Sequence, residues 1–165
     1  MWIVAKYKKK DFNNLTNDIQ KVFGRESIVY RPKILIEKFK NNKLIETELD
    51  LINDYIFIFN QSFNKEYSLM KLSYAKGIKY ILNNSPFNQK DLEEFVSNCK
   101  NFESKNGYIT QDFFNFFEFK KFKFASGPFA NFIFECINQT KNKIKILIGK
   151  KTFIINKNKY LYFPI

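Results

Sequence analysis

Residues 127–132 read Gly-Pro-Phe-Ala-Asn-Phe and stand between two short stretches in which apolar and polar residues alternate. Alternation with a period of 2 is typical of a half-buried strand, and Gly-Pro is a strong turn signal. The segment therefore predicts two strands joined by a tight turn. Gly127 and Pro128 would shape the turn, and Phe129 and Phe132 would anchor the loop on the core.

The same alternation continues toward the C-terminus. Ile148-Gly149-Lys150 predicts the end of one strand and the turn to the next. Five alternating pairs or triplets, separated by turns with glycine or asparagine, predict a small all-β barrel over residues 117–165. They are Phe122/Phe124, Phe132/Phe134, Ile144/Ile146/Ile148, Phe153/Ile155 and Tyr160/Tyr162.

The N-terminal part mixes two periods. Helical spacing of apolar residues, such as Phe12, Leu15, Ile19, Val22 and Phe23, predicts helices, while short apolar runs predict strands. The order predicts an α/β domain over 1–103, mainly antiparallel sheet flanked by helices. Residues 104–116 lose clear periodicity and are predicted to be a linker. Expected strands are 2–7, 27–39, 43–51, 55–59 and 77–82, with a turn at 41–42; expected helices are 11–23, 64–72 and 89–100.

The chain is strongly basic. Lys and Arg number 28 against 16 acids, which gives a net charge of +12. Such an excess favours polyanions because lysines near phosphates release condensed counterions. The alternative explanation is codon bias in an A/T-rich genome, since lysine, asparagine, isoleucine and phenylalanine share A/T-rich codons. Both explanations stay open at this point.

Several function classes find no support in the sequence. The chain has no histidine, which removes Ser-His and Cys-His nucleophiles and most zinc sites, and it has no phosphate-binding glycine loop. The acids Glu93 and Glu94 are expected on a solvated helix face. Cys99 and Cys136 lack metal or disulfide spacing, which indicates reduced thiols. We expect a soluble, cytoplasmic protein without signal peptide, membrane contact, metal, cofactor or catalytic activity.

Residues 127–132 resemble the KOW motif of NusG-type C-terminal domains, and 148–152 resemble that family's next strand and turn. In the N-terminal half Trp2, residues 32–38 and residues 54–58 line up with the RfaH branch of the NusG/RfaH family, and 75–78 fit the element that follows. Three positions depart from the family pattern. Asn53 replaces a usual proline, Ile148 a usual phenylalanine, and Phe119-Lys120 the opening Gly-Asp pair. The resemblance implies a NusG-type N-terminal domain followed by an SH3-like KOW barrel.

The resemblance also implies a function in transcription elongation and antitermination. In that family the N-terminal domain binds the clamp helices of RNA polymerase and suppresses pausing, while the KOW barrel recruits a ribosomal protein, a termination factor or neither. Ordinary core packing is the competing interpretation for these residues, above all for Phe57 and Leu92. The positions suited to the polymerase-binding patch are Ile52, Tyr55, Phe57, Tyr80, Leu92 and Phe95.

Two further segments leave alternatives open. The lysines Lys6, Lys8, Lys9 and Lys10 either contact the non-template DNA strand, as the resemblance implies, or form a solvated charge run. The phenylalanine-rich segment 112–124 either packs into the barrel and its neighbourhood or latches the two domains together.

Three functional hypotheses follow from these patterns. The first is a specialised RfaH-like paralogue, and the second is the housekeeping NusG of a divergent lineage. The third is an RNA- or ribosome-binding KOW protein that makes no polymerase contact.

Overall fold

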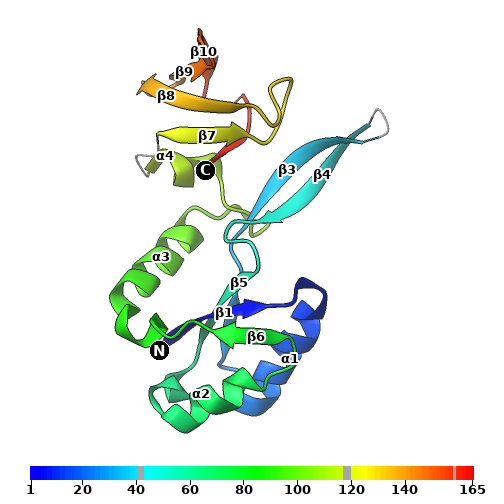
Figure 1. The fold of residues 1–165 in the computed structure, drawn as a ribbon, viewed down its shortest axis with the longest axis vertical. Coiled ribbons are helices and arrows are strands. Elements are labelled where there is room, and N and C mark those ends of the chain that lie inside the picture. Colours follow the sequence, from blue (N-terminus) through cyan, green and yellow to red (C-terminus); the bar gives the residue numbers. More distant parts are fainter. Residues whose placement is uncertain (41–42, 117–119, 158) are drawn as a thin grey trace. The chain divides into compact units, whose positions relative to one another are not determined.

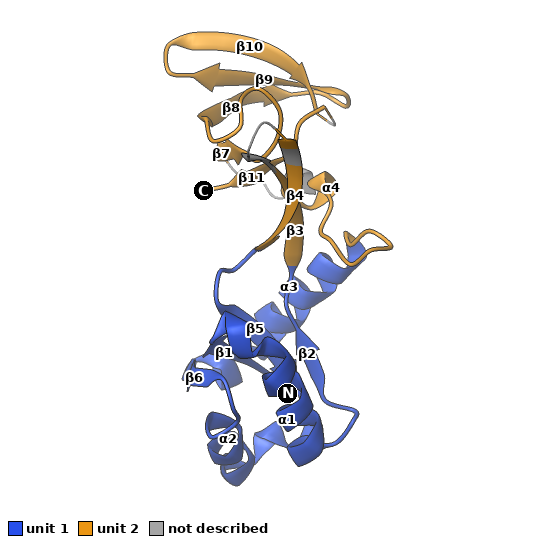
Figure 2. Ribbon diagram, turned by 90° about the vertical axis from the view of Figure 1, so that its right-hand side faces the viewer, with its two compact units in different colours: residues 1–32, 50–101 blue, residues 33–49, 102–165 orange. Residues whose placement is uncertain are grey.

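The computed structural model describes residues 1–40, 43–116, 120–157 and 159–165. The chain forms two compact units (Figure 2). Unit 1 comprises residues 1–32 and 50–101, and unit 2 comprises residues 33–49 and 102–165. The sequence predicted a boundary near 103, with the hairpin in the N-terminal part. The structure instead groups 33–49 with the C-terminal unit.

Unit 1 is an α/β unit built on one antiparallel sheet in the strand order β2-β5-β1-β6 (Figure 1). The predicted strands and helices of this unit are present with shifts of a few residues at their ends, except that the predicted strand 27–39 is divided between this unit and unit 2. Its strands are β1 Trp2–Tyr7, β2 Ile28–Tyr30, β5 Tyr55–Phe59 and β6 Ile78–Ile81. Its helices are α1 Phe12–Phe23, α2 Glu66–Ser73 and α3 Gln89–Asn101, with short 3-10 turns at Lys9–Asp11, Gln61–Asn64 and Ser85–Phe87.

Helices cover both faces of this sheet because its strands are apolar on both sides. Ile3, Ala5 and Tyr7 of β1 pack with Leu15 and Ile19 of α1 on one face. The alternate residues Trp2 and Val4 pack with Val96 of α3 on the other face. Of the apolar residues at helical spacing in α1, Leu15 and Ile19 are fully buried, whereas Val22 is 50% exposed.

Unit 2 contains a five-stranded antiparallel sheet in the order β10-β9-β8-β7-β11, which confirms the predicted small all-β SH3-like barrel. Its core is a stack of aromatic rings: the centroids of Phe124 and Phe134 lie 4.4 Å apart, and both rings contact Tyr162. The strands are β7 Lys121–Phe124, β8 Ile133–Gln139, β9 Lys143–Ile148, β10 Lys151–Asn156 and β11 Tyr162–Pro164; the hairpin strands β3 Lys33–Lys40 and β4 Lys43–Asp50 precede them.

The segment 104–116, expected to be a linker, is structured. Glu103 and Ile109 form an isolated antiparallel bridge across a turn, and helix α4 spans Gln111–Phe116. Ile109, Phe113 and Phe114 are buried, so apolar residues outside any clear period hold this segment in place. The Phe113 ring contacts those of Phe102 and Phe114 within unit 2.

Two other expectations can be compared with the structure. Phe122 and Phe124 are core residues of the sheet, as expected, whereas the Asn41-Asn42 turn and residues 117–119 lie outside the described residues. Cys99 and Cys136 are free thiols. Within the described ranges, no helix has both the length and the apolar character needed to cross a membrane.

Candidate functional site

The α3 face of the unit 1 sheet gathers most of the residues predicted for partner binding. Its buried centre is Trp2, Val4, Phe57 and Val96, and the partly buried residues around this centre are Tyr30, Ile52, Tyr55, Phe59, Leu82, Leu92 and Phe95. We call this set the aromatic face. Strand alternation explains it, since Tyr55, Phe57 and Phe59 of β5 point to the same side.

The predicted residues differ in their accessibility. Phe57 is only 3% exposed and packs against the ring of Phe95 at a centroid distance of 5.4 Å. It is therefore a core residue beneath the accessible side chains of the aromatic face. Ile52, Tyr55, Leu92 and Phe95 are partly buried at its rim. Glu93 and Glu94 lie exposed on α3, as expected.

The structure adds residues that the sequence analysis did not single out. Tyr30 of β2 lies 6.4 Å from the Phe57 ring, and the ammonium group of Lys100 stands over the rings of Trp2 and Tyr30 at 5.8 and 5.5 Å. These residues are far apart in the sequence, and no local pattern links them. The position of Tyr30 within the predicted strand 27–39 was the one available signal.

At one edge of the aromatic face, Tyr55, Lys6 and Tyr80 form a row across β5, β1 and β6. The two hydroxyl oxygens lie 2.9 Å apart, and the Lys6 ammonium group is 5.4 Å from the Tyr55 ring and 5.8 Å from the Tyr80 ring. We call this row the tyrosine arch. Tyr80 is 45% exposed, so the arch presents aromatic surface to solvent with its hydroxyl groups already paired.

Asp54 balances the positive charge beside the arch. Its carboxylate lies 3.8 Å from Lys6 Nζ and 3.1 Å from Lys79 Nζ. The charge of Asp54 is the main cause that raises the pKa of Lys6, and the hydrogen bond with Tyr80 is the main cause that raises the pKa of Tyr55. Desolvation alone would raise the pKa of Asp54, but the hydrogen bond from Lys79 and the charges of both lysines lower it.

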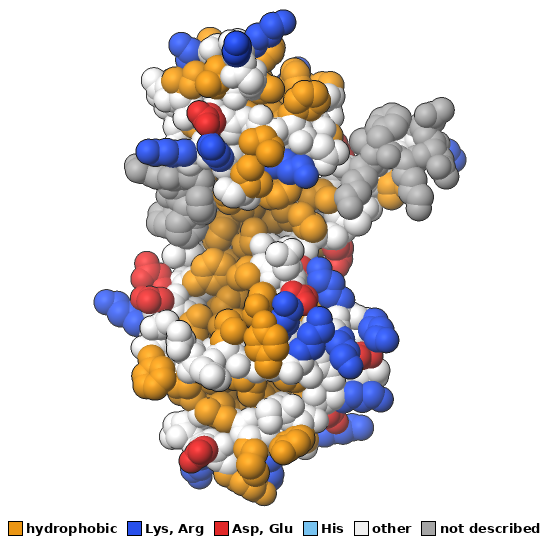
Figure 3. Space-filling view, viewed as in Figure 1, with side chains coloured by type: hydrophobic (Ala, Val, Ile, Leu, Met, Phe, Trp, Pro, Cys, Tyr) orange, Lys and Arg blue, Asp and Glu red, His pale blue; other side chains and the backbone are white. Residues whose placement is uncertain are grey.

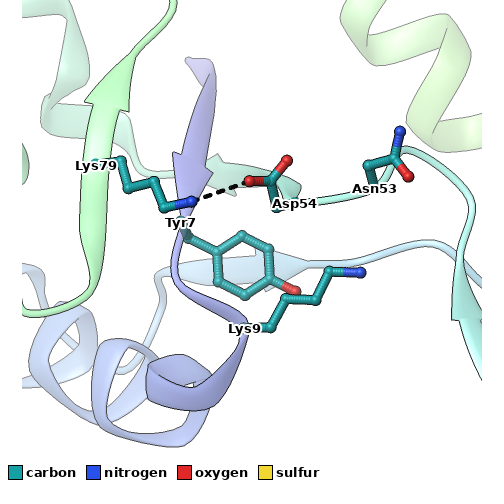
Figure 4. A pocket seen from close by; sticks show the side chains of 5 residues that line it. All are labelled: Tyr7, Lys9, Asn53, Asp54 and Lys79. Atoms are coloured by element: carbon teal, nitrogen blue, oxygen red, sulfur yellow. Dashed lines mark hydrogen bonds and ion pairs between the residues drawn. The ribbon is translucent and has the colours of Figure 1, made fainter.

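A shallow pocket of about 330 Å³ opens next to Asp54 (Figure 4). It is lined by Tyr7, Lys9, Asn53, Asp54 and Lys79. Asn53 adopts a left-handed backbone with φ of 50°, a conformation that proline cannot reach. The local backbone therefore suits the asparagine in place of the family's usual proline.

The four predicted DNA-binding lysines divide into two pairs. Lys6 is paired with Asp54, and Lys9 Nζ lies 2.7 Å from Asp50, which is buried and also 3.3 Å from Arg31 Nε. Lys8 and Lys10 are exposed. Figure 3 shows basic side chains gathered over the region where β1 leads into α1. Lys8 and Lys10 therefore add exposed positive charge to this region.

The predicted turn residues of unit 2 take the expected positions, with one exception. Gly127 has a φ of 75°, and Phe129 packs against Phe124, Phe153 and Tyr160. Phe132, expected to anchor the loop, is 54% exposed. It lies one residue before β8, where the inward position belongs to Phe134.

The second predicted turn lies between β9 and β10. Ile148 and Lys151 are paired there, and Gly149 with a φ of 58° makes the turn together with the exposed Lys150. Pro128 in the first turn is exposed as well.

The chemical groups of this region are aromatic rings, ion-paired acids and lysines. Among the described residues, no group of three or more histidine, cysteine, aspartate or glutamate side chains could hold a metal ion. The acidic groups near the aromatic face, Asp50 and Asp54, are ion-paired with lysine or arginine. What this region presents is half-buried aromatic surface beside fixed positive charge.

The chain matches no protein-family model and no curated protein in sequence. Among solved structures it is similar to the MjSpt4:Spt5 complex in its conformation B. That match has a TM-score of 0.35 and 7% identity and covers 100% of this chain and 98% of the other. It is also similar to NusG of Thermotoga maritima, with a TM-score of 0.32, 12% identity and coverage of 96% and 94%. At this level of similarity, the residues of the chain itself have to carry any functional conclusion.

Proposed function

We propose that this chain is a transcription elongation factor that binds RNA polymerase through the aromatic face of unit 1. The observation that carries the proposal is the gathering of Tyr55, Leu92 and Phe95 around one buried centre, with Tyr80 hydrogen-bonded to Tyr55 at its edge. These are the positions at which the NusG/RfaH resemblance places the contact with the clamp helices. Half-buried aromatic residues with aliphatic neighbours are typical hot spots of protein interfaces.

The rest of the proposal follows from the same resemblance. The factor is a binding protein rather than an enzyme, and by docking on the clamp it suppresses pausing. Lys8 and Lys10, which are exposed beside the unit 1 sheet, would contact the non-template DNA strand. The unit 2 barrel would couple the docked factor to a partner. A specialised RfaH-like paralogue fits better than a housekeeping NusG, because the residues at 32–38 and 54–58 align with that branch.

The test is binding of the full chain to purified RNA polymerase, with Tyr55→Ala as the variant. Tyr55 lies at the rim of the aromatic face rather than in its buried centre, so the fold should persist. Truncating an interface aromatic typically costs 2 kcal/mol or more, which is roughly thirtyfold in affinity.

The matched control is Tyr74→Ala, which removes a tyrosine that is 81% exposed and lies outside the aromatic face. Its affinity for polymerase should stay within about twofold of the parent chain. Equal affinity of the folded Tyr55→Ala variant and the parent chain would exclude the aromatic face as the polymerase site.

A further inference from the structure

The positive charge of the chain is concentrated at its C-terminal end. Residues 120–165 contain ten lysines and one acid, Glu135, and therefore carry +9 of the net charge of +12. Residues 1–119 contain 18 basic and 15 acidic residues and carry only +3. An A/T-rich genome would enrich lysine along the whole chain but would not remove acids from one segment. Codon bias therefore does not explain the charge of the barrel.

The fold brings four of these lysines to one end of the sheet. Lys143 at the start of β9 is paired with Asn156 at the end of β10. The backbone N–H of Lys157 donates to the carbonyl of Asn142 at 3.1 Å, and that of Lys159 donates to Asn156 at 3.1 Å. Lys141 lies in the turn before β9. We call Lys141, Lys143, Lys157 and Lys159 the lysine end.

The turn that carries Lys141 is fixed rather than loose. The backbone N–H of Thr140 donates to the Lys143 carbonyl at 2.8 Å, and the N–H of Lys143 donates to Thr140 Oγ1 at 3.2 Å. Lys159 stands over the ring of Tyr160 at 5.3 Å. Fixed turns hold the four lysine backbones together, so less ordering is needed when a ligand binds.

No carboxylate neutralises the lysine end from within residues 120–157 and 159–165. The acid of this segment, Glu135, is paired with Leu147 in register and lies 3.6 Å from Lys121 Nζ. Leu147 is at the opposite end of β9 from Lys143. The positive field at the lysine end is therefore unopposed by its own segment.

The residues between these lysines can also donate hydrogen bonds. Residues 138–140 are Asn, Gln and Thr, and Asn142 and Asn156 complete the set; all are exposed. Amide and hydroxyl side chains contact phosphate and sugar oxygens in nucleic-acid complexes. The residues from Asn138 to Lys143 in this turn are all polar, whereas a protein interface typically has apolar anchors at its centre. The chemistry favours a phosphate backbone over an acidic protein.

From this placement we infer that the lysine end binds the phosphodiester backbone of nucleic acid without reading base sequence. The inference is independent of the aromatic face of unit 1. A chain that failed to bind polymerase could still have this second site. RNA and DNA share the backbone chemistry, and the experiment separates them.

The test is fluorescence anisotropy of the full chain with labelled single-stranded RNA, single-stranded DNA and duplex DNA over a range of salt concentrations. The test variant replaces Lys141, Lys143, Lys157 and Lys159 with glutamine. The control variant replaces four exposed lysines outside the barrel, Lys21, Lys76, Lys90 and Lys105, with glutamine and so removes the same charge.

For a single strand, we expect the slope of log K against log salt to become shallower by about 3 in the test variant, since each lost phosphate contact contributes about 0.7. Affinity at 0.1 M salt should fall by at least about tenfold. The control variant should bind the probes with nearly the affinity of the parent chain and show nearly the same slope. Whichever of RNA and DNA the parent chain binds more tightly identifies the natural backbone.

Three results would overturn the inference. The test variant could bind as tightly as the parent chain, both variants could lose affinity equally, or the parent chain could bind none of the probes. Circular dichroism of both variants shows whether they are folded, and Lys143→Arg, which keeps the charge, should bind like the parent chain.

Discussion

The hydroxyl oxygens of Tyr55 and Tyr80 lie 2.9 Å apart above Lys6, although β1 separates the two strands that carry them. The rings meet edge to face with centroids 6.5 Å apart. One phenol donates to the other in this bond, so the pair leaves a single O–H group for a partner to accept. The edge of the aromatic face therefore offers aromatic surface together with one hydrogen-bond donor.

The first prediction concerns this hydrogen bond. In Tyr80→Phe the pKa of Tyr55 should fall toward its usual value, because the bond with Tyr80 is the main cause that raises it. The free energy of unfolding should differ from that of the parent chain by no more than about 0.5 kcal/mol, since Tyr80 is a surface residue. An NMR titration of the labelled Tyr55 ring measures the pKa. Tyr74→Phe is the control, and an unchanged pKa of Tyr55 in Tyr80→Phe would contradict the assigned bond.

The second prediction concerns the exposed lysines at the start of α1. The double variant Lys8→Glu with Lys10→Glu should weaken association with a polymerase elongation complex, more strongly at low salt. Exposed charges act over the Debye length, which shrinks from about 30 Å at 0.01 M to about 10 Å at 0.1 M salt. Kinetic association rates at these two salt concentrations measure the effect.

Lys9 is left unchanged in this experiment because it is ion-paired with buried Asp50. Its replacement could destabilise the fold, and a loss of binding could then not be assigned to a lost DNA contact. Reversing Lys21 and Lys90 instead serves as the control. A loss of equal size at both salt concentrations would indicate a folding defect and not a lost charge contact.

The third prediction uses Tyr162, which is fully buried among the rings of Phe122, Phe124 and Phe134. Burial raises its pKa to about 12, against about 10 in an unfolded chain. The folded state holds this proton more tightly. The contribution of this protonated group to the free energy of unfolding is therefore fully present below pH ~10. It is lost as the pH rises through ~12, which lowers the free energy of unfolding by roughly 2–3 kcal/mol.

Tyr162→Phe keeps the ring and removes the ionisable group. Its unfolding free energy should decline less steeply between about pH 10 and 12 than that of the parent chain. Urea unfolding across this pH range measures both proteins. Parallel curves for the two proteins would show that Tyr162 does not titrate with folding.

Much of this fold follows from local sequence patterns. The short apolar runs at Trp2–Tyr7 and Tyr55–Phe59 predict two buried strands, and the structure pairs them in one sheet. The accessibility of individual residues does not follow so directly. Tyr55 and Phe57 share one face of β5, yet only Phe57 is fully covered, because Phe95 of the distant helix α3 packs on it.

Tertiary contacts also explain what the sequence missed. Helix α4 is short, and its buried residues Phe113 and Phe114 are adjacent, so no helical period is visible. Phe129 and Phe132 look equivalent in the sequence, but the position of β8 buries Phe134 and leaves Phe132 exposed. The lysine end depends on strand pairing between β9 and β10, which composition alone cannot show.

The last prediction compares two glycines with left-handed backbones in unit 2. Gly127 has a φ of 75°, and a Cβ atom there would approach Cε1 of Tyr160 to 2.6 Å. Gly149 has a φ of 58°, and a Cβ atom there would meet nothing within 4 Å. Alanine at either position introduces a similar backbone strain of about 1 kcal/mol. Alanine at Gly127 additionally collides with a ring that packs against Phe124 and Phe129.

Gly127→Ala should therefore destabilise unit 2 by about 1–3 kcal/mol more than Gly149→Ala does. The Tyr160 ring cannot yield cheaply, because moving it opens a gap beside Phe124 in the aromatic stack. Chemical denaturation followed by two-dimensional NMR measures the loss and assigns it to residues. Signals of the unit 2 strands should disappear at lower denaturant in Gly127→Ala while those of the unit 1 sheet persist. Equal stability of the two variants would show that the Tyr160 contact is relieved at no cost, and a simultaneous loss of all signals would show that the two units unfold as one.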